Sequence, residues 1–396
     1  MTRNIVDVEW RSHAHRLAGE LEQAGKLTDP RLAAAVQATP RHRFTPTVYR
    51  RQPNGRWACQ VSVDDLDTVY SNTTLITALT DTEETVLSSS TQPGLMTRMI
   101  EALRLTDGAR VLEIGTGTGY NAALLCHLLG EQAVFTVDVE PALVHDARQR
   151  LAQLGHHPLV VAADGAAGLA EHAPFDAILA TCAVPAVPWA WVEQTTPGGV
   201  ILTDLKVAVN AGSLVRLTRT DVDRAEGRFD PTYAAFMDLR HSPGATRRSR
   251  RIHRDHDDAE HRTTCVDPTT PSTSLLVWFL AALELGRDIA HGYTLPPDAG
   301  PGYDGPPSAA FLTTPDGSWA EVTLAAEPNG EHVVVEGGPR RVWRVVEHAH
   351  HTWARLGRPG WNRFGLTVTP DTHTLWLDRP DSPHTWQIPV SPYPSE

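Results

Sequence analysis

The sequence lacks the patterns that mark several broad classes of protein. Its four cysteines (Cys59, Cys126, Cys182 and Cys265) never form a Cys-x-x-Cys pair, so neither a zinc site nor a disulfide framework is predicted. No stretch approaches the roughly 18 consecutive apolar residues of a membrane span, and residues 1–5 lack the apolar segment of a signal peptide. We therefore expect a cytoplasmic protein with no membrane partner.

An excess of positive charge is also missing. The chain of 396 residues has a formal net charge of −12, which argues against a nucleic-acid backbone as its main partner. Charged residues make up 21% of the chain and aliphatic runs are frequent, which predicts a folded protein. Its length allows two domains, each with a core of its own.

The sequence does contain a strand, a turn and a helix centred on three glycines. Val111–Ile114 predicts a short buried strand, and Gly115, Gly117 and Gly119 predict a turn that brings backbone N–H groups close to a ligand. Residues 121–129 follow with the apolar spacing of a helix. Together they form the first unit of a nucleotide-binding α/β fold.

The spacing of these glycines distinguishes between ligands. A dinucleotide fingerprint needs G-x-G-x-x-G, but Tyr120 stands where its third glycine would be. The pattern is instead Glu-x-Gly-x-Gly-x-Gly, which begins at Glu113 and includes Thr116. A turn that faces a cationic sulfonium has no pyrophosphate to hold, and a carboxylate beside it suits a cation. The pattern predicts S-adenosylmethionine (SAM), with a plain glycine-rich turn as the alternative.

Acidic residues at the ends of the next two predicted strands favour SAM. Residues 133–138 end in Asp138, 25 residues after Glu113, and a carboxylate there can accept both hydroxyls of a ribose. Residues 159–165 end in Asp164 followed by a glycine. Asp164 can accept a hydrogen bond from an adenine amino group. Either acid alone would more often be a turn residue. The cofactor-binding residues that we predict are Glu113, Gly115, Thr116, Gly117, Gly119, Asp138, Val139, Asp164 and Gly165.

The alternation of predicted strands and helices sets the fold class. Further strands at 175–181 and 200–203 predict an α/β fold with a doubly wound, mostly parallel, Rossmann-like sheet. We expect this methyltransferase domain at 1–240, a charged linker or strap at 241–262, and a C-terminal α+β accessory domain at 263–396.

The last part of the chain has its own composition. Seven of the eleven tryptophans lie between Trp278 and Trp386; each alone favours a core position, and a peptide-binding platform is the alternative. The linker contains the basic run 247–251. His256 and its neighbouring histidines lack paired cysteines, so a solvated stretch is expected and no metal site.

Hydroxyl side chains precede the helix expected at 94–103. Ser88, Ser89, Ser90 and Thr91 are either caps of that helix or candidates to hold a substrate carboxylate, because they lie just before the predicted SAM strand. A carboxylate is ionised at neutral pH, so we expect such a substrate to accept a methyl group without a general base.

The order of these motifs resembles the protein-L-isoaspartate O-methyltransferases over roughly residues 15 to 205. The matching stretches are Pro40–Pro46, Thr91–Pro93 with Met99, Glu113–Tyr120, Asp164–Gly165, Ala180–Ala183 and Pro197–Gly199. The resemblance implies methylation of an aspartate-derived carboxylate in a peptide, after which the ester closes to a succinimide. It implies catalytic roles for Ser90 and Thr91 and substrate contacts for Gln92, Thr181 and Cys182. Within Pro40–Pro46 we expect Phe44 in a core and the arginines in water.

Two departures from the family pattern touch the substrate side. Thr91 stands where the family has serine, although Ser90 is next to it, and the proline after the last strand is replaced around Thr203–Asp204. The layout, with residues 25–30 near the start and the tryptophan-rich extension, looks like the branch of the family found in graspetide gene clusters. There the resemblance implies a ribosomally made, ligase-cyclised peptide as partner and an aspartimide in the product. Housekeeping repair of isoaspartate and a non-catalytic SAM-binding regulator are the alternatives.

Overall fold

The computed structural model describes residues 2–80, 82, 85–245, 253–257, 259–300 and 303–390, with side chains from residue 9 onward. The basic run 247–251 lies outside the described residues, as does part of the expected linker. Within the described ranges, no helix has both the length and the apolar character needed to cross a lipid bilayer.

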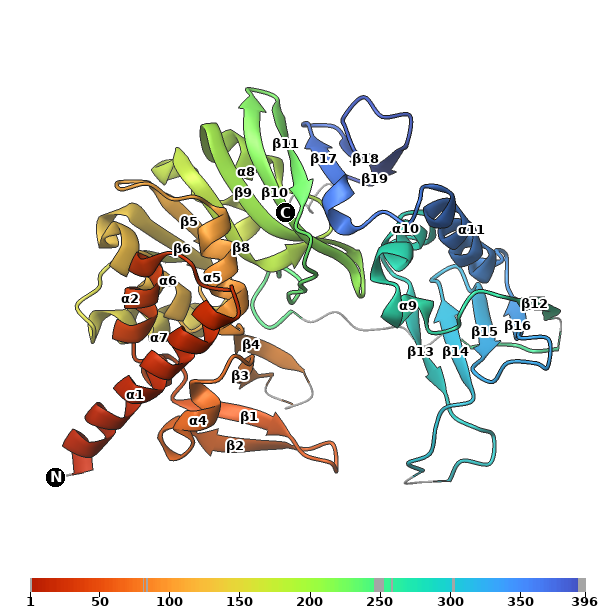
Figure 1. The fold of residues 1–396 in the computed structure, drawn as a ribbon, viewed down its shortest axis with the longest axis horizontal. Coiled ribbons are helices and arrows are strands. Elements are labelled where there is room, and N and C mark those ends of the chain that lie inside the picture. Colours follow the sequence, from red (N-terminus) through yellow and green to blue (C-terminus); the bar gives the residue numbers. More distant parts are fainter. Residues whose placement is uncertain are drawn as a thin grey trace.

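A long central sheet carries the strand, turn and helix unit (Figure 1). Its strand order is β19-β18-β17-β11-β10-β9-β8-β5-β6-β7. The parallel part consists of β5 (Val111–Ile114), β6 (Val134–Asp138), β7 (Leu159–Ala162), β8 (Phe175–Val184) and β9 (Thr195–Ala208). Both β5 and β6 are buried along their whole length, as expected where helices cover both faces of a parallel sheet.

Helices cover the two faces of the parallel part. Alternate residues of β5 belong to two hydrophobic clusters, because successive side chains of a strand point to opposite faces. Val111 packs in the cluster of α1 (Thr2–Gln23), α2 (Pro30–Ala38), α5 (Pro93–Ala102), α6 (Tyr120–Leu129) and α7 (Pro141–Ala152). Leu112 and Ile114 pack in the cluster of α8 (Trp189–Gln194) and α10 (Leu275–Leu285).

Beyond β9 the central sheet becomes antiparallel. This part consists of β10 (Ala211–Asp221), β11 (Arg224–Phe229), β17 (Phe364–Val368), β18 (His373–Leu377) and β19 (Thr385–Ile388). The α/β class and its Rossmann-like parallel part are confirmed. The sheet as a whole is mixed and not mostly parallel, because the chain returns near its end and pairs β17 with β11.

A small antiparallel sheet precedes the parallel strands in the sequence and was not predicted. Its order is β2 (Trp57–Val61), β1 (Thr47–Arg51), β3 (Leu75–Leu79) and β4 (Val86–Ser90). The short helices around it are α3 (Arg41–Phe44), η1 (Ser62–Asp64) and α4 (Leu66–Val69). Short turns of 3-10 helix elsewhere are η2 (Glu131–Ala133), η3 (Gly165–Ala167), η4 (Ala170–His172) and η5 (Trp361–Arg363).

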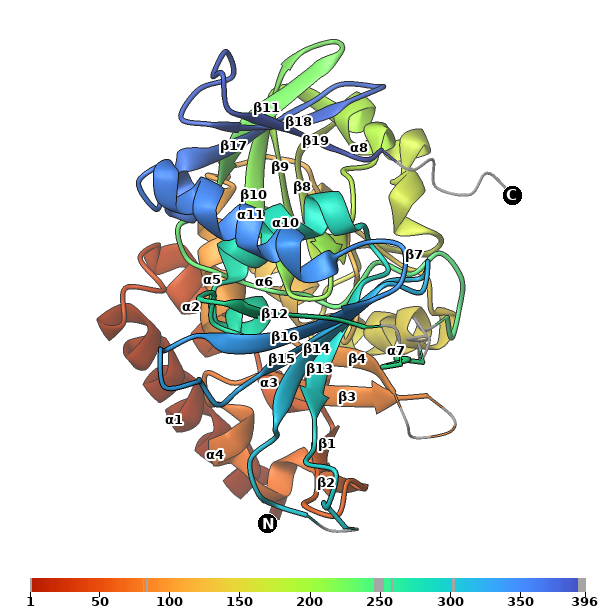
Figure 2. The ribbon, with the colours of Figure 1, turned by 90° about the vertical axis from the view of Figure 1, so that its right-hand side faces the viewer.

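The predicted C-terminal α+β extension is confirmed as a second antiparallel sheet (Figure 2). Its order is β12 (Glu260–Thr264), β16 (His332–Gly337), β15 (Trp319–Thr323), β14 (Ala309–Thr313) and β13 (Ala290–Thr294). Helix α11 (Val342–Arg355) packs on this sheet, and α10, preceded by α9 (Thr270–Thr273), lies between α11 and strands β9 and β10.

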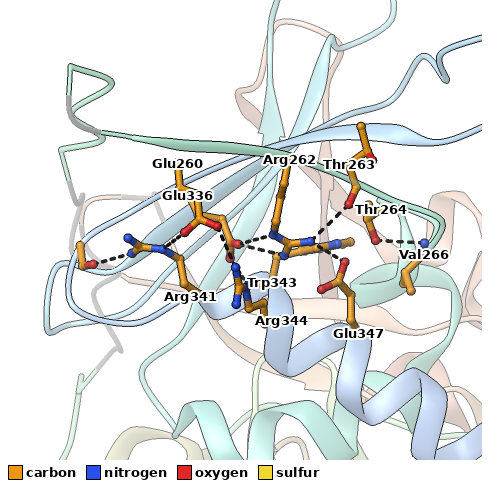
Figure 3. Close-up of polar contacts among 11 residues, drawn as sticks. Glu260, Arg262, Thr263, Thr264, Val266, Glu336, Arg341, Trp343, Arg344 and Glu347 are labelled. Carbon is orange, nitrogen blue, oxygen red and sulfur yellow. Dashed lines mark hydrogen bonds and ion pairs between the residues drawn. The ribbon is translucent and has the colours of Figure 1, made fainter.

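Charged side chains connect α11 to strands β12 and β16 at the edge of the C-terminal sheet (Figure 3). The fully buried Glu336 of β16 accepts a hydrogen bond from the backbone N–H of Trp343 at 2.6 Å and forms an ion pair with Arg262 at 2.9 Å. Arg262 of β12 also reaches Glu347 of α11 at 2.7 Å. Glu336 is a buried carboxylate that is held by a cation and a helix N-terminus. Removing the Arg262 side chain would leave this charge unpaired and strongly destabilise the fold.

The tryptophans of the extension are mostly core residues. Trp278, Trp319, Trp343, Trp361 and Trp376 are each at most 8% exposed. The core interpretation is therefore confirmed for these five, and the alternative of a surface platform is wrong for them. Trp278 also donates from Nε1 to the carbonyl of Val209 at 2.8 Å, which ties α10 to the central sheet. The domain boundaries at 240 and 262 remain predictions, although the parts they separate share a core.

Candidate active site

The glycine turn after β5 has a backbone that other residues adopt rarely. Gly115, Gly117 and Gly119 have φ angles of +95°, +51° and +88°. A Cβ atom on Gly115 would also lie 2.6 Å from Oγ1 of Thr181. Gly119 is the N-cap of α6. The glycines therefore allow the backbone of this turn to lie close to the carboxyl ends of the strands without side chains in between.

A cavity of about 630 Å³ lies beside this turn, at the carboxyl ends of β5, β6 and β8. This volume is typical of a small-molecule site. The predicted residues that line it are Thr91, Gln92, Gly115, Gly117, Asp138, Val139, Gly165, Thr181 and Cys182. We call the part next to Gly115, Gly117 and Asp138 the glycine side, and the part next to α5 the α5 side.

The remaining predicted residues lie around the cavity. Ser90, Glu113 and Thr116 line a small adjoining pocket, which shares Thr91, Gly115, Gly117 and Thr181 with the main cavity. Gly119 and Asp164 are not among the residues lining either space. Most of the predicted residues therefore lie around the cavity and its adjoining pocket, and their roles remain predictions.

Asp138 ends β6 with its carboxylate on the glycine side. Oδ2 accepts a hydrogen bond from the backbone N–H of Gly117 at 2.8 Å, and Oδ1 accepts one from that of Glu140 at 3.1 Å. Burial raises the pKa of Asp138, while these two backbone bonds oppose that rise. Each carboxylate oxygen keeps room for one more hydrogen bond, so the oriented group can still accept from a ligand.

Glu113 lies deeper than expected. Its side chain is fully buried and accepts from Nδ2 of Asn121 and Oγ1 of Thr136, each at 2.6 Å. Burial raises the pKa of Glu113 to about 7. The carboxylate therefore lies behind the glycine turn, where it holds the start of α6 and strand β6, and it does not line the main cavity.

Asp164 is engaged by protein groups at the end of β7. Oδ1 accepts from the backbone N–H of Ala166 at 2.9 Å, and Oδ2 lies 2.8 Å from Nδ1 of His241. Its neighbour Gly165 lines the cavity, and a Cβ atom there would lie 2.5 Å from Cγ2 of Ile114. Close packing thus requires the glycine, and contact of Asp164 with an adenine stays a prediction.

Of the hydroxyl residues before α5, the serines lie in a strand and Thr91 follows it, and none of them is the helix cap. Ser88 and Ser90 lie in β4, and the N-cap of α5 is Gln92, whose side chain makes no capping hydrogen bond. The cap interpretation is therefore wrong. Strand pairing with β3 places this segment along the α5 side, where Thr91 and Gln92 line the cavity.

Arg41 is buried, contrary to the expectation that the arginines of Pro40–Pro46 face water. Phe44 is in the core as expected, and Arg43 is exposed. The Arg41 guanidinium donates hydrogen bonds at 2.8 to 3.5 Å to backbone carbonyls of two segments: Val69, Ser71 and Thr73, and Ser90 and Thr91. Burial lowers the pKa of Arg41 to about 10, so it stays charged at neutral pH. Arg41 therefore fixes the backbone that carries Thr91.

Residues 232–240 form a wall of the cavity that the sequence did not reveal. Backbone hydrogen bonds join this wall to Ala183 of β8. Oδ2 of Asp204 accepts from the backbone N–H of Phe236 at 2.8 Å, and Lys206 pairs with Asp238 at 2.6 Å. Burial raises the pKa of Asp204 to about 6. The wall has no regular secondary structure, so the sequence contains no periodicity that would predict it. The one indication was the replacement of the family's proline around Thr203–Asp204.

Comparisons with known proteins identify relatives of this chain. A family model described as Protein-L-isoaspartate(D-aspartate) O-methyltransferase matches residues 12–228, more than half of the chain. Protein-L-isoaspartate O-methyltransferase of Pectobacterium atrosepticum is 36% identical over 187 residues, covering 47% of this chain and 77% of that protein. The enzyme of the same name from Rhodospirillum rubrum is 35% identical over 237 residues, covering 58% and 96%.

The fold of the whole chain also has a counterpart. A solved structure titled protein-L-isoaspartate O-methyltransferase superposes with a TM-score of 0.54 at 22% identity. The match covers 92% of this chain and 99% of that one. The similarity thus extends over most of the C-terminal part and is a similarity of fold.

Proposed function

The chain belongs to the protein-L-isoaspartate O-methyltransferase family, and we propose that it methylates an aspartate-derived carboxylate in a peptide. Membership makes it a SAM-dependent carboxyl O-methyltransferase. The observation that supports the peptide acceptor is the cavity that joins the glycine turn and Asp138 to Thr91 and Gln92.

The glycine side fits the methyl donor. The positive φ angles of its glycines bring bare backbone to the cavity, and Asp138 presents an oriented carboxylate that we assign to the ribose hydroxyls. We assign the adenine to the neighbourhood of Asp164 and Gly165. When bound, SAM supplies an electrophilic methyl group on a cationic sulfur, and the ionised form of Glu113 behind the turn favours that charge.

On the α5 side, the protein has to orient a carboxylate and exclude water. We assign its orientation to hydrogen bonds from Thr91 and Gln92, with Ser90, Thr181 and Cys182 around them. Arg41 keeps this backbone in place, and the wall 232–240 shields the reacting oxygen. No base is needed, because the acceptor is already ionised. In the ester, attack by the next backbone nitrogen forms the succinimide and releases methanol.

The isoaspartyl carboxylate, and hence protein repair, is the first candidate acceptor. It is supported by relatives at 35 to 36% identity whose names state that substrate. The C-terminal extension does not argue against it, since a solved structure with that title covers 92% of this chain. Within the described residues, no cavity-lining residue comes from beyond Arg240.

The second candidate acceptor is an aspartate side chain of a ligase-cyclised ribosomal peptide. It is supported by the departures from the family pattern, one of which lines the cavity while the other holds one of its walls. Thr91 lines the cavity, and Asp204 holds the backbone of Phe236 in the wall. An altered acceptor side suits an acceptor other than a generic isoaspartyl residue.

One experiment separates these candidates. The purified protein is given SAM and, in turn, a synthetic isoaspartyl peptide, its aspartyl counterpart and a ligase-cyclised aspartyl peptide; mass spectrometry follows methyl gain and methanol loss. Preference for the isoaspartyl peptide supports repair, and preference for the cyclised one supports maturation. SAM binding without any transfer would indicate a non-catalytic regulator. Truncation after residue 240 is no substitute, because it strips β17 from β11 and α10 from β10.

A further inference from the structure

Two cations, Lys26 and Arg98, line the α5 side of the cavity. Only two lysines occur in the sequence, and the other, Lys206, pairs with Asp238 at 2.6 Å. The Lys26 ammonium has no hydrogen bond or ion pair with any residue in the described part of the chain. Among the described residues, Arg98 has one acidic partner, Asp230 at 3.9 Å, and donates to the carbonyl of Thr232 at 3.3 Å.

The lack of a side chain at position 94 lets Lys26 lie against the helix that carries Arg98. A Cβ atom on Gly94 would lie 2.8 Å from Cδ of Lys26, so the lysine stem crosses the first turn of α5. Gly94 and Arg98 are four residues apart on that helix and therefore share a face. The N-terminal end of α5 adds its positive dipole to the same region.

The carboxylates that line the cavity do not neutralise Lys26. Asp138 is on the glycine side and accepts from two backbone N–H groups, and Asp238 pairs with Lys206. A chain with a net charge of −12 repels acidic peptides over most of its surface. An unpaired cation inside the cavity therefore gives it a local preference for anions.

We propose that Lys26 and Arg98 bind a second carboxylate of the acceptor peptide, next to the carboxylate that is methylated. This role rests on the proposed peptide methylation and adds to it a preference for acidic peptides. The second carboxylate comes from an Asp or Glu side chain near the modified residue or from the C-terminus of the peptide. Neither cation takes part in methyl transfer itself.

The test measures peptide affinity for the complex of the protein with S-adenosylhomocysteine, so it needs no turnover. Pairs of synthetic isoaspartyl peptides carry Glu or Gln next to the modified residue, each with a free or an amidated C-terminus. The natural protein should bind the peptide with the second carboxylate about fivefold more tightly, as for a partly exposed ion pair. The free and amidated pairs show which carboxylate is bound.

Variants of Lys26 then assign this preference. Lys26→Gln should abolish it and Lys26→Arg should keep it, whereas Lys26→Glu should favour a peptide with Lys at the same position. Arg56→Gln, in the exposed turn between β1 and β2, removes one positive charge away from the cavity and should change nothing. Affinity for SAM should stay the same in all four variants.

Three outcomes would overturn the proposal. Equal binding of the Glu and Gln peptides by the natural protein would show that no second carboxylate is bound. Weaker SAM binding in Lys26→Gln would mean that the cations hold the donor. An equal loss of affinity for the Glu and Gln peptides in Lys26→Gln would mean that the two cations hold the methylated carboxylate. If the proposed methylation is wrong instead, the binding preference persists while methyl transfer is absent.

Discussion

The two sides of the cavity are built in different ways. The glycine side comes from the ends of neighbouring parallel strands, with Gly115, Asp138 and Gly165 each in a short motif. The α5 side combines segments that are far apart in the sequence, from Lys26 through Thr91 to the wall 232–240. One side is thus determined by local sequence, and the other depends on how distant segments pack.

This difference explains what the sequence predicted well. Strands β5 to β9 and their helices follow from local apolar patterns, and parallel pairing brings their carboxyl ends to one edge of the sheet. The glycine turn needs positive φ angles, and its three glycines indicate this in the sequence. Most of the predicted cofactor-binding residues therefore lie around one cavity, although Gly119 and Asp164 do not line it and the depth of Glu113 was not expected.

What the sequence did not predict depends on long-range contacts. Pairing of β11 with β17 joins residues about 140 positions apart, and no local pattern specifies such a partner. Arg41 was expected in water because arginine is mostly exposed; burial becomes favourable only because five carbonyls from two other segments surround it. Lys26 and Arg98 have no motif at all.

The largest effect is expected from Arg41→Met, which removes the buried cation behind Thr91. Each carbonyl that loses its donor and stays buried costs about 1–3 kcal/mol, so we expect the unfolding free energy to fall by at least about 3–5 kcal/mol. In protein that still folds, peptide affinity should fall much more than SAM affinity. Chemical denaturation measures the unfolding free energy and calorimetry measures the two affinities, with Arg43→Met at an exposed position as the control. Equal loss of both affinities would erase the distinction between the two sides.

A smaller effect is expected from Asp138→Ala on the glycine side. Loss of a charged hydrogen-bond acceptor for the ribose should weaken SAM binding by about 1.5–3 kcal/mol per bond. Peptide affinity in the presence of S-adenosylhomocysteine at saturation should change little. Calorimetry with SAM checks this, and Asp176→Ala, remote at the start of β8, is a matched control. Unchanged SAM affinity would show that the ribose assignment is wrong.

The double variant Ser90→Ala, Thr91→Ala tests the α5 side without changing charge. We expect methyl transfer to slow by about tenfold, because one or two neutral hydrogen bonds that orient the acceptor are lost. SAM affinity should stay near normal, since neither hydroxyl bonds to the glycine turn in the structure. Single-turnover kinetics and SAM calorimetry give the two values. A collapse of SAM binding would mean that these hydroxyls support the fold and not the acceptor.

The smallest effect is expected from Glu113, whose pKa burial raises to about 7. Because the folded pKa exceeds the usual value of about 4.5, this group's contribution to stability is complete below pH 4.5 and is lost as pH rises through 7. A cationic sulfonium favours the ionised form, so SAM affinity should increase a few-fold between pH 6 and pH 8.

Glu113→Gln removes this titration and keeps one acceptor oxygen for Nδ2 of Asn121, while its amide N–H group can donate to Oγ1 of Thr136. Calorimetry across the same pH range should then show a SAM affinity that no longer follows pH, and peptide affinity should be unaffected in both proteins. A pH dependence that survives in Glu113→Gln would assign the titrating group elsewhere. The buried acid would then be a scaffold for α6 and β6 alone, and the charge preference of the glycine side would rest on Asp138.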